Sequence, residues 1–126
     1  MRLLLDTNAL LWALTAPEHL SKTAADEIRD PANEVFASAV NAWEIGVKRA
    51  KGRLKGELDL EPTLAQHGFG VLPLTMAHAL AIESLPPQHH DPFDRMLVAQ
   101  AQVESLVLVT SDRKMSNYAI AVLPAR

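Results

Sequence analysis

Four acidic side chains stand where a carboxylate could do chemistry. Asp6 directly follows the apolar stretch LLL, and Asp112 ends the stretch LVLVTSD, while Glu44 and Asp94 lie near the starts of two segments with helical periodicity. Carboxylates gathered in one cleft repel each other and are tolerated when a divalent cation bridges them. Oxygen ligands suit Mg²⁺ or Mn²⁺, and such ions support hydrolysis of phosphodiester bonds.

Each of these acids also has a purely structural explanation. Asp6 and Asp112 are suited to cap the helix or turn that follows them. Asp91 precedes a proline and then Asp94, the pattern of an N-cap, so for Asp91 we favour this structural role. Asp94 alone would be explained by a favourable interaction with the helix dipole. Glu44 would be exposed to solvent if the helical phase differed by one residue. Four such acids at the ends of elements favour a site over four separate caps.

The elements that must position these acids alternate along the chain. We expect strands at 2–5, 34–38, 70–74, 106–112 and 118–123, with the last at an edge of the sheet. We expect helices at 9–14, 21–29, 39–51, 61–67, 75–85 and 93–105. Three of these helices are expected to be capped, by Ser21, Ser38 and Thr75. This alternation predicts an α/β fold with a parallel sheet between helices. Because parallel strands present their carboxyl ends at one edge, Asp6 and Asp112 are expected to converge.

The periodicity of the segment 39–51 predicts which of its faces is buried. Val40, Trp43 and Val47 recur on one helical face, so we expect Trp43 to pack inward with Glu44 beside it. Trp12 and Trp43 are accordingly interpreted as core or interface residues. They are not expected to be platforms for stacking bases.

Composition bounds the class of protein. The chain has 126 residues, of which 48% are hydrophobic and 21% charged, and shows no linker or repeat, so residues 1–126 are expected to form a single domain. It has no cysteine, which excludes disulfides and thiolate metal sites. We see no apolar run of the roughly 20 residues that span a membrane and no signal peptide, and therefore expect a cytoplasmic protein.

Four short motifs together resemble a known family. They are LLLDTNALLW at residues 3–12, S-x-x-x-x-WEI at 38–45, HDPFDR at 90–95 and LVTSD at 108–112. In order and spacing they resemble the PIN domain, and more closely the VapC-type toxins of bacterial toxin–antitoxin pairs, from residue 3 to about residue 123. The resemblance implies a PIN-like three-layer α/β/α fold with a central, mainly parallel twisted sheet of four to five strands.

The resemblance also implies an activity. The family consists of metal-dependent ribonucleases with a quartet of acids, which by motif position falls on Asp6, Glu44, Asp94 and Asp112. Asp6 and Asp94 are expected to bind Mg²⁺ or Mn²⁺ most directly, and the other two to complete the cluster. An endoribonuclease of this type leaves 5′-phosphate and 3′-hydroxyl ends. The resemblance further implies a homodimer and a cognate antitoxin with a segment across the active-site groove.

Polar neighbours of the quartet are candidates for supporting roles. Thr7, Asn8, Ser38 and Ser111 are expected to orient carboxylates or water, and Asp91 to act as a cap or supporting residue.

The segment 48–55 is basic although the net charge is −3. It either meets RNA phosphates or forms a solvated helix end, where cations suit the dipole. The candidates for RNA contact are Lys48, Lys51, Arg53 and, outside this segment, Arg95.

Alternatives to an antitoxin-restrained ribonuclease remain open. One is a catalytically silent PIN-like module that binds RNA or protein, and another is a stand-alone PIN nuclease without an antitoxin. The adjacent His89 and His90 are poorly spaced for zinc. A phosphatase of the aspartyl-phosphate type would need Asp-x-Asp after the first strand, where this chain has Asp-Thr-Asn.

Overall fold

The centre of the molecule is a five-stranded parallel sheet. A computed structural model describes residues 1–87 and 91–126, and in this part of the chain the strand order is β3-β2-β1-β4-β5. The strands are β1 (Arg2–Leu5), β2 (Glu34–Ser38), β3 (Gly70–Leu72), β4 (Val107–Thr110) and β5 (Val122–Pro124). The first strand of the sequence therefore lies in the middle of the sheet, paired in parallel with both β2 and β4.

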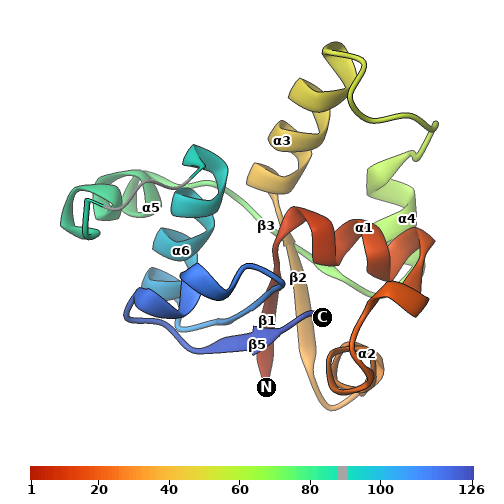
Figure 1. The fold of residues 1–126 in the computed structure, drawn as a ribbon, viewed down its shortest axis with the longest axis horizontal. Coiled ribbons are helices and arrows are strands. Elements are labelled where there is room, and N and C mark those ends of the chain that lie inside the picture. Colours follow the sequence, from red (N-terminus) through yellow and green to blue (C-terminus); the bar gives the residue numbers. More distant parts are fainter. Residues whose placement is uncertain (88–90) are drawn as a thin grey trace.

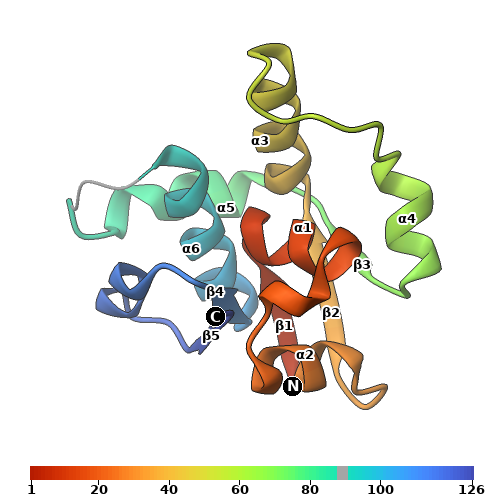
Figure 2. The same ribbon diagram turned by 45° about the vertical axis from the view of Figure 1, so that its right-hand side comes forward.

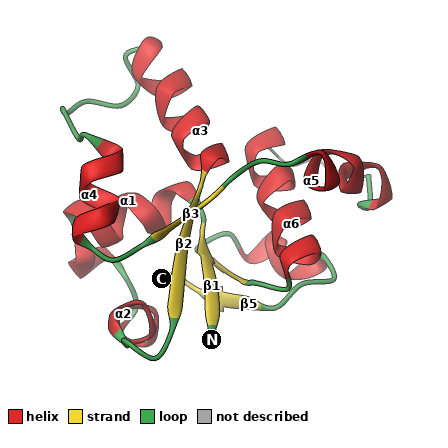
Figure 3. Ribbon diagram, turned by 180° about the vertical axis from the view of Figure 1, so that it is seen from behind, coloured by secondary structure: helices red, strands yellow, loops and turns green. Residues whose placement is uncertain are grey.

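Helices cover both faces of this sheet, as Figures 1 and 3 show. They are α1 (Thr7–Thr15), α2 (Lys22–Arg29), α3 (Ala39–Ala50), α4 (Leu60–Gln66), α5 (Met76–Ala81) and α6 (Pro92–Glu104), with 3-10 turns η1 (Pro17–His19), η2 (Ile82–Ser84) and η3 (Arg113–Asn117). The expected three-layer α/β/α architecture is confirmed. In the described part of the chain, no helix has the length and apolar character needed to cross a membrane.

The alternation of side chains along β1 separates two cores. Leu3 and Leu5 point to one face and join a core with Leu10 of α1 and Leu64 of α4. Leu4 points to the other face, into a core to which α6 contributes the most buried residues. All three leucines of β1 are completely buried, so hydrophobic packing on both sides holds the strand that ends at Asp6.

Helix starts follow the expected capping chemistry. The side chains of Asp6, Ser21, Ser38, Thr75 and Asp91 all accept hydrogen bonds from backbone amides at the N-termini of their helices. Because Asp6 caps α1, that helix begins at Thr7, two residues before the predicted start.

Three strands differ from the prediction, and one of them, β4, spans only Val107–Thr110 of the expected range 106–112. The strand expected at 70–74 ends at Leu72, because Pro73 has no amide to donate to a ladder. The strand expected at 118–123 begins only at Val122, since Tyr118 closes the turn η3 by donating its amide to the carbonyl of Met115. The edge position of this last strand is confirmed.

The predicted inward face of α3 is wrong by part of a turn. Trp43 is 53% exposed and packs edge-on against Phe93, with ring centroids 4.6 Å apart, whereas Val40, Asn41 and Glu44 point inward. Because successive helical residues are about 100° apart, burial of Glu44 turns Trp43 outward. A search for apolar periodicity misses this face, since two of its members are polar.

Candidate active site

The four predicted acids come from four elements around one end of the sheet. Asp6 follows β1 and Asp112 follows β4, and these neighbouring parallel strands end on the same side. Glu44 lies on α3 and Asp94 on the first turn of α6, and these two helices pack against each other. We call Asp6, Glu44, Asp94 and Asp112 the acid cluster.

Burial and like charges act together on Asp94. The pKa of Asp94 is raised from its ordinary 3.8 to about 7: loss of solvent is the largest cause, and the negative charges of Asp91 and of the other three members of the acid cluster contribute the rest. All four members therefore share one electrostatic environment.

Asp6 has the same pattern with two opposing hydrogen bonds. Burial raises the pKa of Asp6 above its ordinary value, while hydrogen bonds from the Thr110 hydroxyl and the Ala9 amide lower it and the charges of Glu44 and Asp112 raise it. The Ala9 amide donates to Oδ1 of Asp6 at 2.8 Å. Asp6 is thus both a helix cap and a member of the acid cluster, which combines the two alternatives that the sequence left open.

Both oxygens of the Glu44 carboxylate are engaged. The hydroxyl of Thr7 donates to Oε1 at 2.6 Å, and the ammonium of Lys48 lies 2.6 Å from Oε2. Thr7 therefore contacts a carboxylate, as its prediction proposed. Lys48, predicted to contact RNA, points into the acid cluster.

Asn41 is a supporting residue that the sequence analysis missed. Its side chain is completely buried, donates to the carbonyl of Leu5 at 3.2 Å and to Oγ1 of Thr7 at 3.1 Å, and accepts from the amide of Ser38 at 2.7 Å. It thereby joins β1, α1 and the start of α3 directly behind Glu44. The spacing Ser38 to Asn41 is that of a capping box, with Asn where Glu or Gln is usual, and this signal could have identified it.

Thr110 is a second supporting residue missed from sequence. It is buried at the end of β4, its hydroxyl contacts Asp6, and its Oγ1 accepts the amide of Asp112 at 3.1 Å. One hydroxyl therefore links the two acids that end neighbouring strands. Its place two residues before Asp112 was the available signal.

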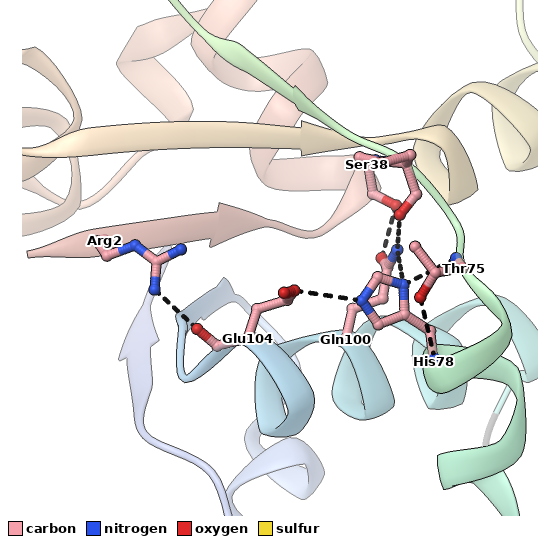
Figure 4. A network of polar contacts seen from close by, with 7 residues as sticks. Arg2, Ser38, Thr75, His78, Gln100 and Glu104 are labelled. Atoms are coloured by element: carbon pink, nitrogen blue, oxygen red, sulfur yellow. Dashed lines mark hydrogen bonds and ion pairs between the residues drawn. The ribbon is translucent and has the colours of Figure 1, made fainter.

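Ser38 contacts an amide side chain rather than a carboxylate. Its hydroxyl donates to Oε1 of Gln100 at 2.6 Å and accepts from the amide of Val40. Gln100 and His78 are buried as well, and Figure 4 shows how they join α5 and α6 to the end of β2. Ser38 thus positions the start of α3, on which Glu44 lies.

The remaining predicted supporting residues lie in different settings. Asn8 and Ser111 are exposed, next to acids but outside the buried network. Asp91 caps α6 through the amides of Phe93 and Asp94, at 2.7 and 3.3 Å, which is its expected structural role. Its charge also contributes to the raised pKa of Asp94.

The other basic candidates are separated in space. Lys51 and Arg53 are exposed where α3 ends, at the tip that projects from the body of the molecule in Figures 1 and 2. Arg95 donates to the carbonyl of Pro86 at 2.8 Å and to the Tyr118 hydroxyl at 3.2 Å. The histidine pair His89 and His90 lies outside the described residues.

The chemistry of this donor set fits a hard divalent cation. Carboxylate oxygens are the ligands that Mg²⁺ and Mn²⁺ prefer, and a positive ion would relieve the repulsion that raises the pKa of Asp94. Within residues 1–87 and 91–126, no three acidic or histidine side chains already stand in ligating positions. The side chains of Asp6 and Glu44 are instead held by the hydrogen bonds and the ion pair described above.

Comparisons with known proteins agree with this arrangement. A family model described as PIN domain matches residues 3–121. Ribonuclease VapC22 of Mycobacterium tuberculosis is 30% identical over 120 residues, which cover 91% of this chain and 90% of that protein.

Solved structures share the fold at lower sequence identity. A chain in the crystal structure of VapBC2 from Rickettsia felis, bound to a promoter DNA fragment, matches with a TM-score of 0.70 and 12% identity over 98% of both chains. DNA-bound VapBC from Salmonella typhimurium matches with a TM-score of 0.63 and 18% identity, over 98% of this chain and 97% of that one.

Proposed function

Because this chain belongs to the PIN-domain family, we propose that it is a metal-dependent endoribonuclease and the toxin of a toxin–antitoxin pair. The observation that carries the proposal is the acid cluster, in which burial, the charge of Asp91 and the charges of the other three members together raise the pKa of Asp94 to about 7. Such a concentration of negative charge has little structural use and suits a site that recruits a cation. The relationship to Ribonuclease VapC22 supports RNA as the substrate.

The metal would be Mg²⁺ or Mn²⁺, held chiefly by Asp6 and Asp94 and completed by Glu44 and Asp112. When bound, a divalent ion supplies positive charge that stabilises the transition state of phosphodiester hydrolysis. The protein's own contribution is to hold the four carboxylates in place. Asp6 is fixed by Ala9 and Thr110, Glu44 by Thr7, and Asp94 by its position on a capped helix.

The proposed partners are a cognate antitoxin and a second copy of the chain. The VapBC structures from Rickettsia felis and Salmonella typhimurium, which contain chains with this fold, support the antitoxin. An antitoxin segment lying across the acid cluster would restrain cleavage of RNA in the cytoplasm.

Cleavage of RNA by the purified protein tests the activity. We expect products with 5′-phosphate and 3′-hydroxyl ends in Mg²⁺ or Mn²⁺, loss of cleavage in chelator, and loss of cleavage in Asp6→Asn. Asp26→Asn is the matched control, because Asp26 is an exposed carboxylate that pairs with Lys22 on α2. Cleavage that persists in chelator would exclude the metal mechanism. A folded protein that binds RNA and never cleaves it would instead be a silent binding module.

A further inference from the structure

The ion pair between Lys48 and Glu44 differs from an ordinary helix-surface pair. The two residues are four apart on α3, and their charged atoms are 2.6 Å apart. The side chain of Glu44 is 7% exposed and that of Lys48 is 39% exposed. Lys22 and Asp26 have the same spacing and a distance of 2.7 Å, but their side chains are 90% and 58% exposed. Lys48 therefore brings a positive charge from the surface onto a buried carboxylate.

The surroundings of Glu44 make this charge important. Glu44 interacts electrostatically with Asp6 and Asp94, and a buried carboxylate among like charges is strongly unfavourable without a cation. Thr7 occupies Oε1, so the ammonium of Lys48 engages the remaining oxygen, Oε2. An ammonium and a divalent cation repel each other and do not share one carboxylate oxygen at contact distance.

We propose that Lys48 is the built-in counter-ion of the acid cluster: its ammonium stabilises Glu44 and competes with a divalent cation for Oε2. The proposal rests on the acid cluster being the metal site of the proposed ribonuclease. Lys48 is a positioning residue in this account, because it acts through Glu44. Its flexible, partly exposed side chain allows the ammonium to leave when a divalent ion arrives. Metal binding then exchanges one cation for another, which weakens the apparent metal affinity.

Two substitutions separate charge from side-chain packing. Lys48→Met keeps an unbranched apolar side chain and removes the charge, whereas Lys48→Arg keeps the charge. Lys51→Met is the matched control for net charge, since Lys51 is exposed at the end of the same helix. Lys22→Met is the control for loss of a pair with the same spacing. Mn²⁺ binding by calorimetry without RNA, and thermal unfolding in chelator, are the two measurements.

The proposal predicts opposite effects of Lys48→Met on the two measurements. In chelator the melting temperature falls by about 4 °C or more, because Glu44 loses its partner. Mn²⁺ binds about tenfold more tightly, because a competing positive charge is gone. Lys48→Arg stays close to the wild type in both measurements, and Lys51→Met and Lys22→Met change each of them much less than Lys48→Met does.

Other outcomes overturn the proposal. Unchanged or weaker Mn²⁺ binding in Lys48→Met would show that Lys48 does not compete with the ion. If Lys48 only contacts RNA, Lys48→Met would leave both measurements unchanged and would lower the affinity for RNA instead. If the wild type binds no Mn²⁺ at all, the proposed metal-dependent function fails with it. If the wild type binds Mn²⁺ and Lys48→Met binds it no more tightly, only the role of Lys48 is refuted.

Discussion

The hydroxyl of Thr7 donates a 2.6 Å hydrogen bond to the carboxylate of Glu44, and this bond fastens the first turn of α1 to the second turn of α3. The same hydroxyl oxygen accepts from Asn41. One buried oxygen atom therefore connects the segment after β1 with the helix that provides Glu44. Thr7 follows Asp6 directly, so the residue that holds Glu44 is the chain neighbour of Asp6.

Replacing Thr7 with valine should damage both stability and activity. Thr7→Val keeps the shape but leaves Oε1 of Glu44 without a donor and removes one of the two acceptors of the Asn41 amide, which costs about 1–3 kcal/mol of the free energy of unfolding. We expect RNA cleavage to fall by about tenfold or more, since misplacement of a catalytic group is costly. Urea unfolding and initial cleavage rates measure the two effects. Thr7→Ser, which keeps the hydroxyl, should retain most of both, and equal losses in Thr7→Ser and Thr7→Val would contradict this role of the hydroxyl.

Two asparagines on neighbouring helices should respond differently to substitution. Asn41→Leu removes three buried hydrogen bonds, to Leu5, Thr7 and Ser38, and should lower the free energy of unfolding by about 1–3 kcal/mol or more. Asn8→Ala should change it by less than about 0.5 kcal/mol, because Asn8 is exposed. Chemical denaturation of both variants provides the comparison. A larger loss in Asn8→Ala would show that the buried network does not support the cluster.

Stability in chelator should fall as the pH rises. The pKa of Asp94 is about 7 in the folded protein and near its ordinary 3.8 in the unfolded chain, so the folded state holds the proton more tightly. The contribution of Asp94 to stability therefore declines as the pH rises from 3.8 to about 7 and then levels off. Asp6, whose pKa is also raised, acts in the same direction.

Asp94→Asn isolates this effect. Melting temperatures measured in chelator between about pH 5 and about pH 8 should decline less in the variant than in the wild type. Parallel pH profiles would refute a raised pKa for Asp94.

The exposed cations after α3 should act through salt-dependent RNA binding. In an Asp6→Asn background, which prevents cleavage, replacing Lys51 and Arg53 with glutamine should reduce the slope of log affinity against log salt by about 1.4 for single-stranded RNA, at roughly 0.7 for each lost phosphate contact. Lys22→Gln is the control, because Lys22 already pairs with Asp26. An unchanged slope would favour a solvated helix end.

The parts of the fold that were predictable from sequence are those set by local pattern. The apolar strands ending at Asp6 and near Asp112 are continuous and uninterrupted, and Ser21, Ser38, Thr75 and Asp91 are residue types that cap helices. The carboxyl ends of β1 and β4 meet because the strands are parallel neighbours. Local signals therefore indicated which edge of the sheet carries acids.

What could not be predicted depends on contacts between distant residues. Asn41 and Glu44 are polar yet face inward, because Thr7 and Leu5, more than thirty residues earlier in the chain, satisfy their hydrogen bonds. Apolar periodicity alone predicts instead that Trp43 is on the buried face of α3. Likewise Lys48 belongs to a run of cations in the sequence, and only the fold shows that its ammonium lies on Glu44.

The strand order also bears on how such a nuclease is made on the ribosome. β1 is translated first but lies in the middle of the sheet, and its neighbour β4 ends at Thr110, just before Asp112. A nascent chain therefore lacks both the second flank of β1 and the last acid until β4 and Asp112 have been translated. The acid cluster can therefore form only after β4 has been translated and has paired with β1, because that pairing brings Asp112 near Asp6.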